Sequence, residues 1–250
     1  MTKHVLDVWS PQLRARRRVD VYLPAAYDAD SRRRYPVLYM HDGQNLSDPA
    51  TAFGGVTWDV EGALTRLASR GIEPILVGIH HGGDQRLAEL SPFPDPKHGG
   101  GRGDRYARFV AGTLKAAIDR RFRTRADRDA TAIAGSSMGG LISLYAFFRE
   151  PSPFGRAAVM SPSIWFGERR ILDFVEQARS AHGRLYVDVG TDEGPGTLRD
   201  ARALARALRQ KGYRQGQTMR YVEARGHRHQ EQHWAARLPA ALAFLFKDAT

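Results

Sequence analysis

The sequence predicts an α/β fold in which a mostly parallel central sheet is flanked by helices on both faces. Short apolar, β-branched runs alternate with segments of helical periodicity along most of the 250 residues, a pattern typical of parallel sheets covered on both sides. A Gly-x-Ser-x-Gly motif also stands between one such run and the next helical segment. Because the chain has neither an internal repeat nor a linker-like stretch, we expect a single domain over residues 1–250, without a large lid domain.

The individual elements are predicted from hydrophobic periodicity. Strands are expected at residues 17–23, 35–40, 74–79, 130–134, 157–161, 184–189 and 218–224. Helices are expected at residues 58–70, 104–123, 139–149, 168–181 and 197–212. The clearest helical stripe has apolar residues at spacings of three and four, namely Tyr106, Phe109, Val110, Leu114, Ile118 and Phe122. The glycine-rich residues 97–104 are expected to form a loop that leads into this helix.

Composition excludes several classes of protein. The absence of cysteine excludes disulfides, a thiolate nucleophile and a Cys-based zinc site. The net charge of +11 comes mainly from arginine, with clusters at 14–18 and 31–34; no nucleic-acid motif surrounds them, and we expect no nucleic-acid partner. The N-terminal segment lacks the apolar core of a signal peptide, and the longest uncharged run, 130–148, is interrupted by glycines and serines. We therefore expect a soluble, cytoplasmic protein without a membrane partner.

The strongest chemical signal is the GSSMG motif at residues 135–139. It directly follows the strand segment 130–134 and directly precedes a helical segment, which is the context of a nucleophile elbow. The turn is so tight that the positions two before and two after the nucleophile must lack a bulky Cβ. This selects Ser137 rather than Ser136, and the N-terminus of the following helix favours an oxyanion there.

A nucleophilic serine needs a base, and the base needs an orienting acid. In elbow-type hydrolases the chain order is serine, acid, histidine. Asp192 and Glu193 follow one later strand segment, and the cluster of His227, His229 and His233 follows the last one. Both partners therefore occur at successive strand ends, in the required order.

Several segments along nearly the whole chain occur in the order found in one known family. They are YPVLYMHDGQNLSD (35–48), AELSPFPD (88–95), GGGRGDRYARFV (99–110), IAGSSMGGLISLYA (133–146), SPSIWF (161–166), DVGTDEG (188–194) and HQEQHW (229–234). Together they resemble the Putative esterase family of α/β-hydrolases, which includes enterochelin-esterase-like proteins and the feruloyl and acetyl-xylan esterases of carbohydrate esterase family 1. The resemblance implies an α/β-hydrolase fold.

The resemblance also selects among the candidate residues. The family's acid stands three positions after the glycine that closes the strand, which implies Glu193; Asp192 is the alternative, and its side chain could instead cap the following helix. The family's histidine precedes a tryptophan by five residues, which implies His229 before Trp234. His227 and His233 are then bystanders. Glu231 is expected only to stabilise the start of a helix.

Two backbone amides are expected to form the oxyanion hole. One is the amide of Met138, the residue after the nucleophile. By resemblance, the second is the amide of Gln44, in the loop that His41, Asp42 and Gly43 shape.

A metal site is the first alternative to this interpretation. The spacing of the histidines at 227, 229 and 233 lacks the carboxylate of common dinuclear motifs, and no His-Glu-x-x-His occurs. His80 and His81 follow a strand and can line the pocket, but a role in a turn is favoured. We therefore expect no metal.

The resemblance implies a serine esterase without a metal or organic cofactor. An acyltransferase and a non-catalytic binding protein on the same scaffold remain alternatives. The positive charge mildly favours an anionic small-molecule ester, and activity should fall at acid pH, near or below roughly 6.5. One or two aromatic residues on expected loops or strand ends can form a platform for an acyl or sugar group; the candidates are Trp58, Phe93, Trp165 and Phe166.

Overall fold

The computed structural model describes residues 1–149 and 151–247, and its centre is an eight-stranded sheet. The strand order is β1-β2-β4-β3-β7-β8-β9-β10. β2 runs antiparallel to its two neighbours, and the remaining pairs are parallel. The strands are β1 (Thr2–Ser10), β2 (Ala15–Leu23), β3 (Val37–His41), β4 (Ile75–Ile79), β7 (Thr131–Ser136), β8 (Arg156–Met160), β9 (Arg184–Gly190) and β10 (Met219–Ala224). The expected mostly parallel sheet is confirmed.

The strand at the N-terminal edge was missing from the predicted set. β1 alternates exposed and covered side chains over most of its length and pairs with β2 in a hairpin, Leu6 opposite Val19. An edge strand with one solvated face lacks the continuous apolar run that identifies the central strands. Its single buried apolar side chain, Leu6, is too weak a signal on its own.

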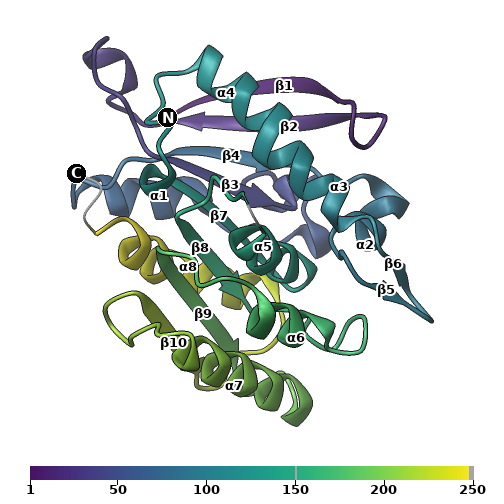
Figure 1. The fold of residues 1–250 in the computed structure, drawn as a ribbon. Coiled ribbons are helices and arrows are strands. Elements are labelled where there is room, and N and C mark those ends of the chain that lie inside the picture. The colour runs from purple at the N-terminus through teal and green to yellow at the C-terminus, as the bar shows by residue number, and fades with distance from the viewer. Residues whose placement is uncertain (150, 248–250) are drawn as a thin grey trace.

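Helices cover both faces of the sheet, as Figure 1 shows. One face is covered by α3 (Gly103–Arg108), α4 (Lys115–Arg121), α5 (Met138–Phe148), α6 (Arg170–Gln177) and α7 (Pro195–Gln210). The other is covered by α1 (Val60–Ala68) and α8 (Glu231–Phe246). Among the described residues, no helix is both long and apolar enough to cross a membrane.

The helix expected over 104–123 is confirmed in position and runs without a break from Gly103 to Arg121, but its middle is π-helical. A π-helical turn at Phe109–Leu114 joins α3 to α4, and Phe122 lies just beyond the end of α4. Every member of the predicted apolar stripe is nevertheless buried. The glycine-rich stretch before α3 is more ordered than a plain loop, because β5 (Pro94–Asp95) and β6 (Gly99–Gly100) form a small hairpin there.

The sheet separates two apolar cores. Successive side chains of a strand point to opposite faces, so Val37 and Tyr39 of β3 pack in one core while Leu38 and Met40 pack in the other. The parallel strands all end at the same edge of the sheet. The loops that follow these carboxyl ends therefore meet there, which is where open α/β sheets bind ligands.

Candidate active site

Ser137 lies at a strained turn between β7 and α5. Its backbone has φ 56° and ψ −120°, a conformation that side-chain-bearing residues rarely adopt. A Cβ on Gly135 would lie 2.8 Å from the backbone of Gly139, and one on Gly139 would lie 3.2 Å from the His41 Cβ. Close backbone approach thus requires Gly135, as expected for this turn, whereas a side chain at Gly139 would need the His41 side chain to shift slightly.

The segment after β8 holds Ser137 from one side. The amide of Ser137 donates to the Met160 carbonyl at 3.0 Å, and the Ser163 amide donates to the Ser137 carbonyl at 3.0 Å. The hydroxyl of Ser163 also lies 3.0 Å from the hydroxyl of Ser137. Among the residues that the structure describes, the Ser137 hydroxyl bonds to Ser163 and not to His229.

Glu193 and His229 form a short hydrogen-bonded pair. The His229 Nδ1 lies 2.8 Å from the Glu193 Oε2, and the Glu193 side chain is fully buried while that of His229 is 40% exposed. The other carboxylate oxygen accepts from the Gly190 amide at 2.7 Å and from the Ser161 hydroxyl at 2.6 Å. Burial would raise the pKa of Glu193, but these hydrogen bonds outweigh it and hold the pKa below its ordinary value.

Asp192, the alternative acid, points elsewhere. Its carboxylate accepts from the Thr191 hydroxyl at 3.0 Å and its backbone amide donates to the His227 carbonyl. The alternative that it caps the next helix is wrong, because Gly194 is the N-cap of α7 and no side-chain cap is formed.

The three clustered histidines have different surroundings. The His229 ring stands edge-on to Trp234 with centroids 4.8 Å apart. His227 and His233 stack on each other at 4.7 Å, and the His233 Nδ1 accepts from the Arg228 amide. Within the described part of the chain, no three His, Cys, Asp or Glu side chains are arranged to hold a metal ion.

Behind Glu193 lies a buried polar network that the sequence analysis did not identify. The Ser161 hydroxyl accepts from the Trp234 indole at 3.0 Å and from the Arg237 guanidinium at 2.8 Å. Arg237 also pairs with Asp188 at 2.9 Å. Burial raises the pKa of Asp188 to about 6, against the opposing effect of Arg237. Three elements are thus joined directly behind the acid: β9, α8 and the segment after β8.

The loop after β3 forms the opposite wall of the site. Asp42 has a left-handed backbone at φ 55°, and its carbonyl accepts from the Asn45 amide at 2.9 Å, closing a short 3-10 turn. Gly43 is required there, since a Cβ would lie 2.6 Å from the Gly78 backbone. Arg86, on the short helix α2 (Arg86–Glu89), makes two 2.7 Å bonds to the Asp42 carboxylate. Burial would raise the pKa of Asp42, but Arg86 outweighs it and the pKa is lowered.

His41, the last residue of β3, is buried beneath this loop. Its Nδ1 lies 2.8 Å from the Tyr106 hydroxyl. Burial lowers the pKa of His41 to about 4. The ring is therefore neutral at physiological pH.

A pocket of about 430 Å³ opens between these walls. It is lined by Asp42, Gln44, Asn45, Thr51, Phe53, His81, Arg86, Ser136, Ser137, His229, Glu231 and Trp234. The structure thus brings Ser137, Gln44 and His229 to one cavity, and Met138, the first residue of α5, follows Ser137 directly. Glu231 begins α8 as expected, but it also faces the pocket.

The aromatic residues of this pocket differ from those expected. Trp58 and Phe166 are buried, with Trp58 packed against Trp234. Trp165 is 51% exposed but does not line the pocket. Phe53, which the sequence analysis did not consider, lines it and is 76% exposed. His81 also lines the pocket, which was the less favoured of the two roles expected for His80 and His81. His80 instead lies 3.2 Å from the Asp20 carboxylate.

A mostly parallel sheet with a strained Ser137 at the carboxyl end of a central strand is the architecture of the α/β-hydrolases. The chain belongs to the family described as Putative esterase, whose model matches residues 10–245. It is a carboxylic-ester hydrolase.

The chain is also similar to individual proteins and solved structures. The chain is 25% identical over 243 residues to the uncharacterized protein YbbA of Bacillus subtilis, covering 92% of each. It is 36% identical over 110 residues to a siderophore enterobactin esterase of Emericella nidulans, covering 41% of this chain and 35% of that protein. The solved structure of a ferulic acid esterase has a TM-score of 0.76 at 23% identity, covering 98% of each chain, which shows the shared fold.

Proposed function

We propose that the chain is a serine esterase that acts through an acyl-enzyme, with Ser137 as nucleophile, His229 as base and Glu193 as orienting acid. The observation that carries the proposal is the 2.8 Å contact between the His229 Nδ1 and the buried Glu193 carboxylate. An ionised Glu193 accepts the Nδ1 proton, which leaves the other ring nitrogen free to accept a proton. His229 and Ser137 face the same pocket.

In the proposed reaction the Ser137 hydroxyl turns from Ser163 to His229 as the ester binds. His229 takes the hydroxyl proton while the oxygen attacks the ester carbonyl, and then protonates the leaving alcohol. The backbone amides of Met138 and Gln44 stabilise the oxyanion, aided by the N-terminus of α5. Water, activated by His229, releases the acid. The mechanism uses no metal or organic cofactor, and the whole chain acts as one catalytic domain.

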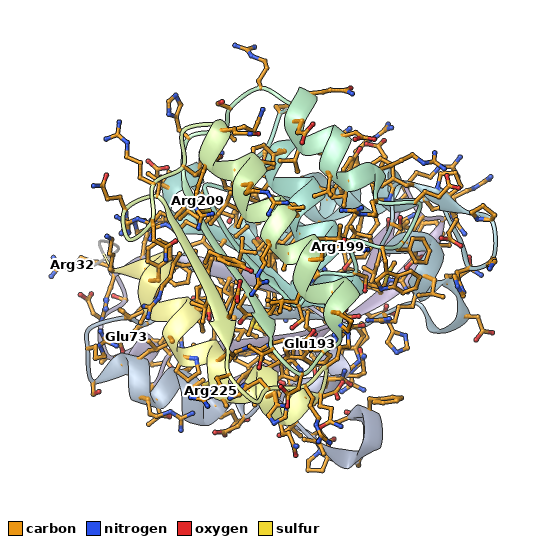
Figure 2. All side chains as sticks on the ribbon, turned by 90° about the horizontal axis from the view of Figure 1, so that it is seen from below. Arg32, Glu73, Glu193, Arg199, Arg209 and Arg225 are labelled. Atoms are coloured by element: carbon orange, nitrogen blue, oxygen red, sulfur yellow. The ribbon has the colours of Figure 1, made fainter. Side chains whose placement is uncertain are left out.

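The pocket favours a neutral ester with an apolar or aromatic part. Its one guanidinium, Arg86, is engaged by Asp42, and Glu231 adds a second carboxylate. In Figure 2, Arg32, from one of the arginine clusters, projects from the rim of the molecule, away from Glu193. These surroundings give no support to the sequence-based preference for an anionic substrate. Phe53 offers an exposed apolar face at the mouth.

The test is an ester panel that includes aryl, feruloyl and siderophore-type esters. We expect Ser137→Ala and His229→Ala to lose on the order of 10⁴–10⁶ in kcat, while His227→Ala stays close to wild type. A fluorophosphonate probe should label Ser137, as seen by mass spectrometry of the modified peptide. Near-native turnover by Ser137→Ala would contradict the mechanism, and an inactive His227→Ala beside an active His229→Ala would reassign the base. Adding acceptor alcohols distinguishes acyl transfer from hydrolysis by its products.

A further inference from the structure

The hydroxyl of Ser161 has only one way to arrange its hydrogen bonds. It lies within 3.0 Å of the Trp234 indole Nε1 and 2.8 Å of an Arg237 nitrogen. Indole and guanidinium groups can only donate, and a hydroxyl has two lone pairs and one proton. Both lone pairs are therefore occupied, and the single proton must go to the Glu193 Oε1 at 2.6 Å.

This arrangement constrains the carboxylate of Glu193. Its Oε1 accepts from Ser161 and from the Gly190 amide, with Arg237 at 3.6 Å, so it cannot carry a proton. The other carboxylate oxygen, Oε2, faces the His229 Nδ1 and can accept its proton in a hydrogen bond. The imidazole is thereby held with its proton on Nδ1, and its Nε2 remains an acceptor for the nucleophile.

Ser161 is itself held in a strained backbone conformation. It is the first residue after β8, is completely buried, and has φ 40°, a value that favours glycine. Its amide donates to the Asp188 carbonyl at 3.0 Å and lies 3.1 Å from the Asp188 carboxylate. Strain of this kind persists only where the surroundings determine the conformation, and here they aim one hydroxyl at the acid.

We propose that Ser161 is a positioning residue for the esterase reaction: Trp234 and Arg237 orient its hydroxyl, which in turn fixes Glu193 as an acceptor and His229 in the tautomer that can take a proton from Ser137. The proposal rests on the proposed function of Ser137, Glu193 and His229. Ser161 acts through Glu193 and does not contact the substrate.

The test compares two variants of Ser161 that differ in backbone strain. Ser161→Ala removes the hydroxyl and keeps the strain, whereas Ser161→Gly removes the hydroxyl and relieves the strain, because glycine adopts a positive φ freely. The control is Ser10→Ala on β1. Ser10, like Ser161, has a buried hydroxyl, which in this case accepts from the Leu13 backbone amide. All three variants are compared in thermal unfolding and in kcat, KM and the pH profile of kcat/KM.

We expect both Ser161 variants to lose kcat to a similar extent, roughly 10- to 100-fold, with KM close to wild type. With one donor fewer, the Glu193 carboxylate becomes a stronger base and holds the protonated imidazole more tightly. The acid limb of kcat/KM should therefore move up by about half to one pH unit. The titratable and charged groups around the Glu193–His229 pair are His227, His233, Glu231, Arg237, Asp188 and Tyr186, and none of them is changed in these variants.

The outcomes separate this proposal from the proposed function. If Ser137→Ala stays active, the triad assignment fails and the role of Ser161 fails with it. If Ser137→Ala is inactive but Ser161→Gly keeps the wild-type kcat and acid limb, only the positioning role is overturned. A Ser161→Gly protein that is as stable as wild type, slow, and shifted in its acid limb supports the role, since a merely structural serine would not move the pH profile.

Discussion

The two walls of the pocket differ in how firmly their side chains are held. Behind the wall formed by His229 and Trp234, here called the acid-base wall, the side chains of Glu193 and Arg237 are almost entirely buried, and each makes several hydrogen bonds or ion pairs to different elements. On the loop wall, Phe53 is 76% exposed and sits on a 3-10 turn, Phe53–Gly55, that contains no buried residue. The difference suggests that the first wall serves chemistry, which needs fixed geometry, and the second serves substrate selection.

The largest expected effect tests the acid-base wall. Glu193→Gln keeps the shape of the side chain but can present its amide N–H₂ to His229, which favours the wrong tautomer. We expect kcat to fall by about 10⁴-fold, as for an orienting acid made neutral. Asp192→Asn is the matched control and should retain activity, because among the described residues the Asp192 carboxylate bonds to the Thr191 hydroxyl and not to a histidine ring. Steady-state kinetics decide between them, and an inactive Asp192→Asn beside an active Glu193→Gln would exchange the two assignments.

A smaller effect is expected where the loop wall is anchored. Arg86→Met removes both hydrogen bonds to the Asp42 carboxylate, which is mostly buried, and leaves it without its cationic partner. The turn that carries Gln44 should loosen, and kcat/KM should fall on the order of 10- to 100-fold, less than the 10²–10³ in kcat that loss of an oxyanion donor costs. Arg16→Met, which breaks the exposed pair with Asp7, is the control and should be silent. If both variants behave alike, the loop does not depend on its ion pair.

The central sheet could be predicted from the sequence because its strands are apolar on both faces. One local turn predicted Ser137, and two family spacings predicted Glu193 and His229, which are in contact in the structure. Ser161 and Arg237 left no such signal, since they are 76 positions apart and meet only after folding. The aromatic platform was misplaced for the same reason: whether an aromatic ring is covered depends on tertiary partners, as with Trp58.

The stability of the region beneath the loop wall should depend on pH through His41. Its pKa falls from an ordinary value of 6.5 to about 4 on folding, so the unfolded chain binds a proton that the folded chain does not. Stability from this residue is complete above about pH 6.5 and is lost as the pH falls toward 4. Between pH 7 and 5 the free energy of unfolding should drop by about 2 kcal/mol from His41 alone.

The matched variant for this prediction is His41→Asn, which keeps an acceptor near Tyr106 but cannot titrate. Urea unfolding at several pH values measures the slope. His41→Asn should show a flatter dependence than wild type between pH 7 and 5, whatever its absolute stability. Equal slopes in the two proteins would mean that other groups, and not this buried ring, cause the loss of stability in acid.

The smallest expected effect concerns Phe53 and tests whether the loop wall selects substrates. Contact with an aryl or alkyl group of the ester would cover part of the exposed ring, worth about 1 kcal/mol. Phe53→Ala should therefore raise KM several-fold for aryl and feruloyl esters and leave kcat and stability near wild type. Trp165→Ala is the matched control: this ring is also exposed, but it packs against His98 and Phe166 outside the pocket. If Trp165→Ala raised KM and Phe53→Ala did not, recognition would belong to the segment after β8, and the division of labour between the two walls would be wrong.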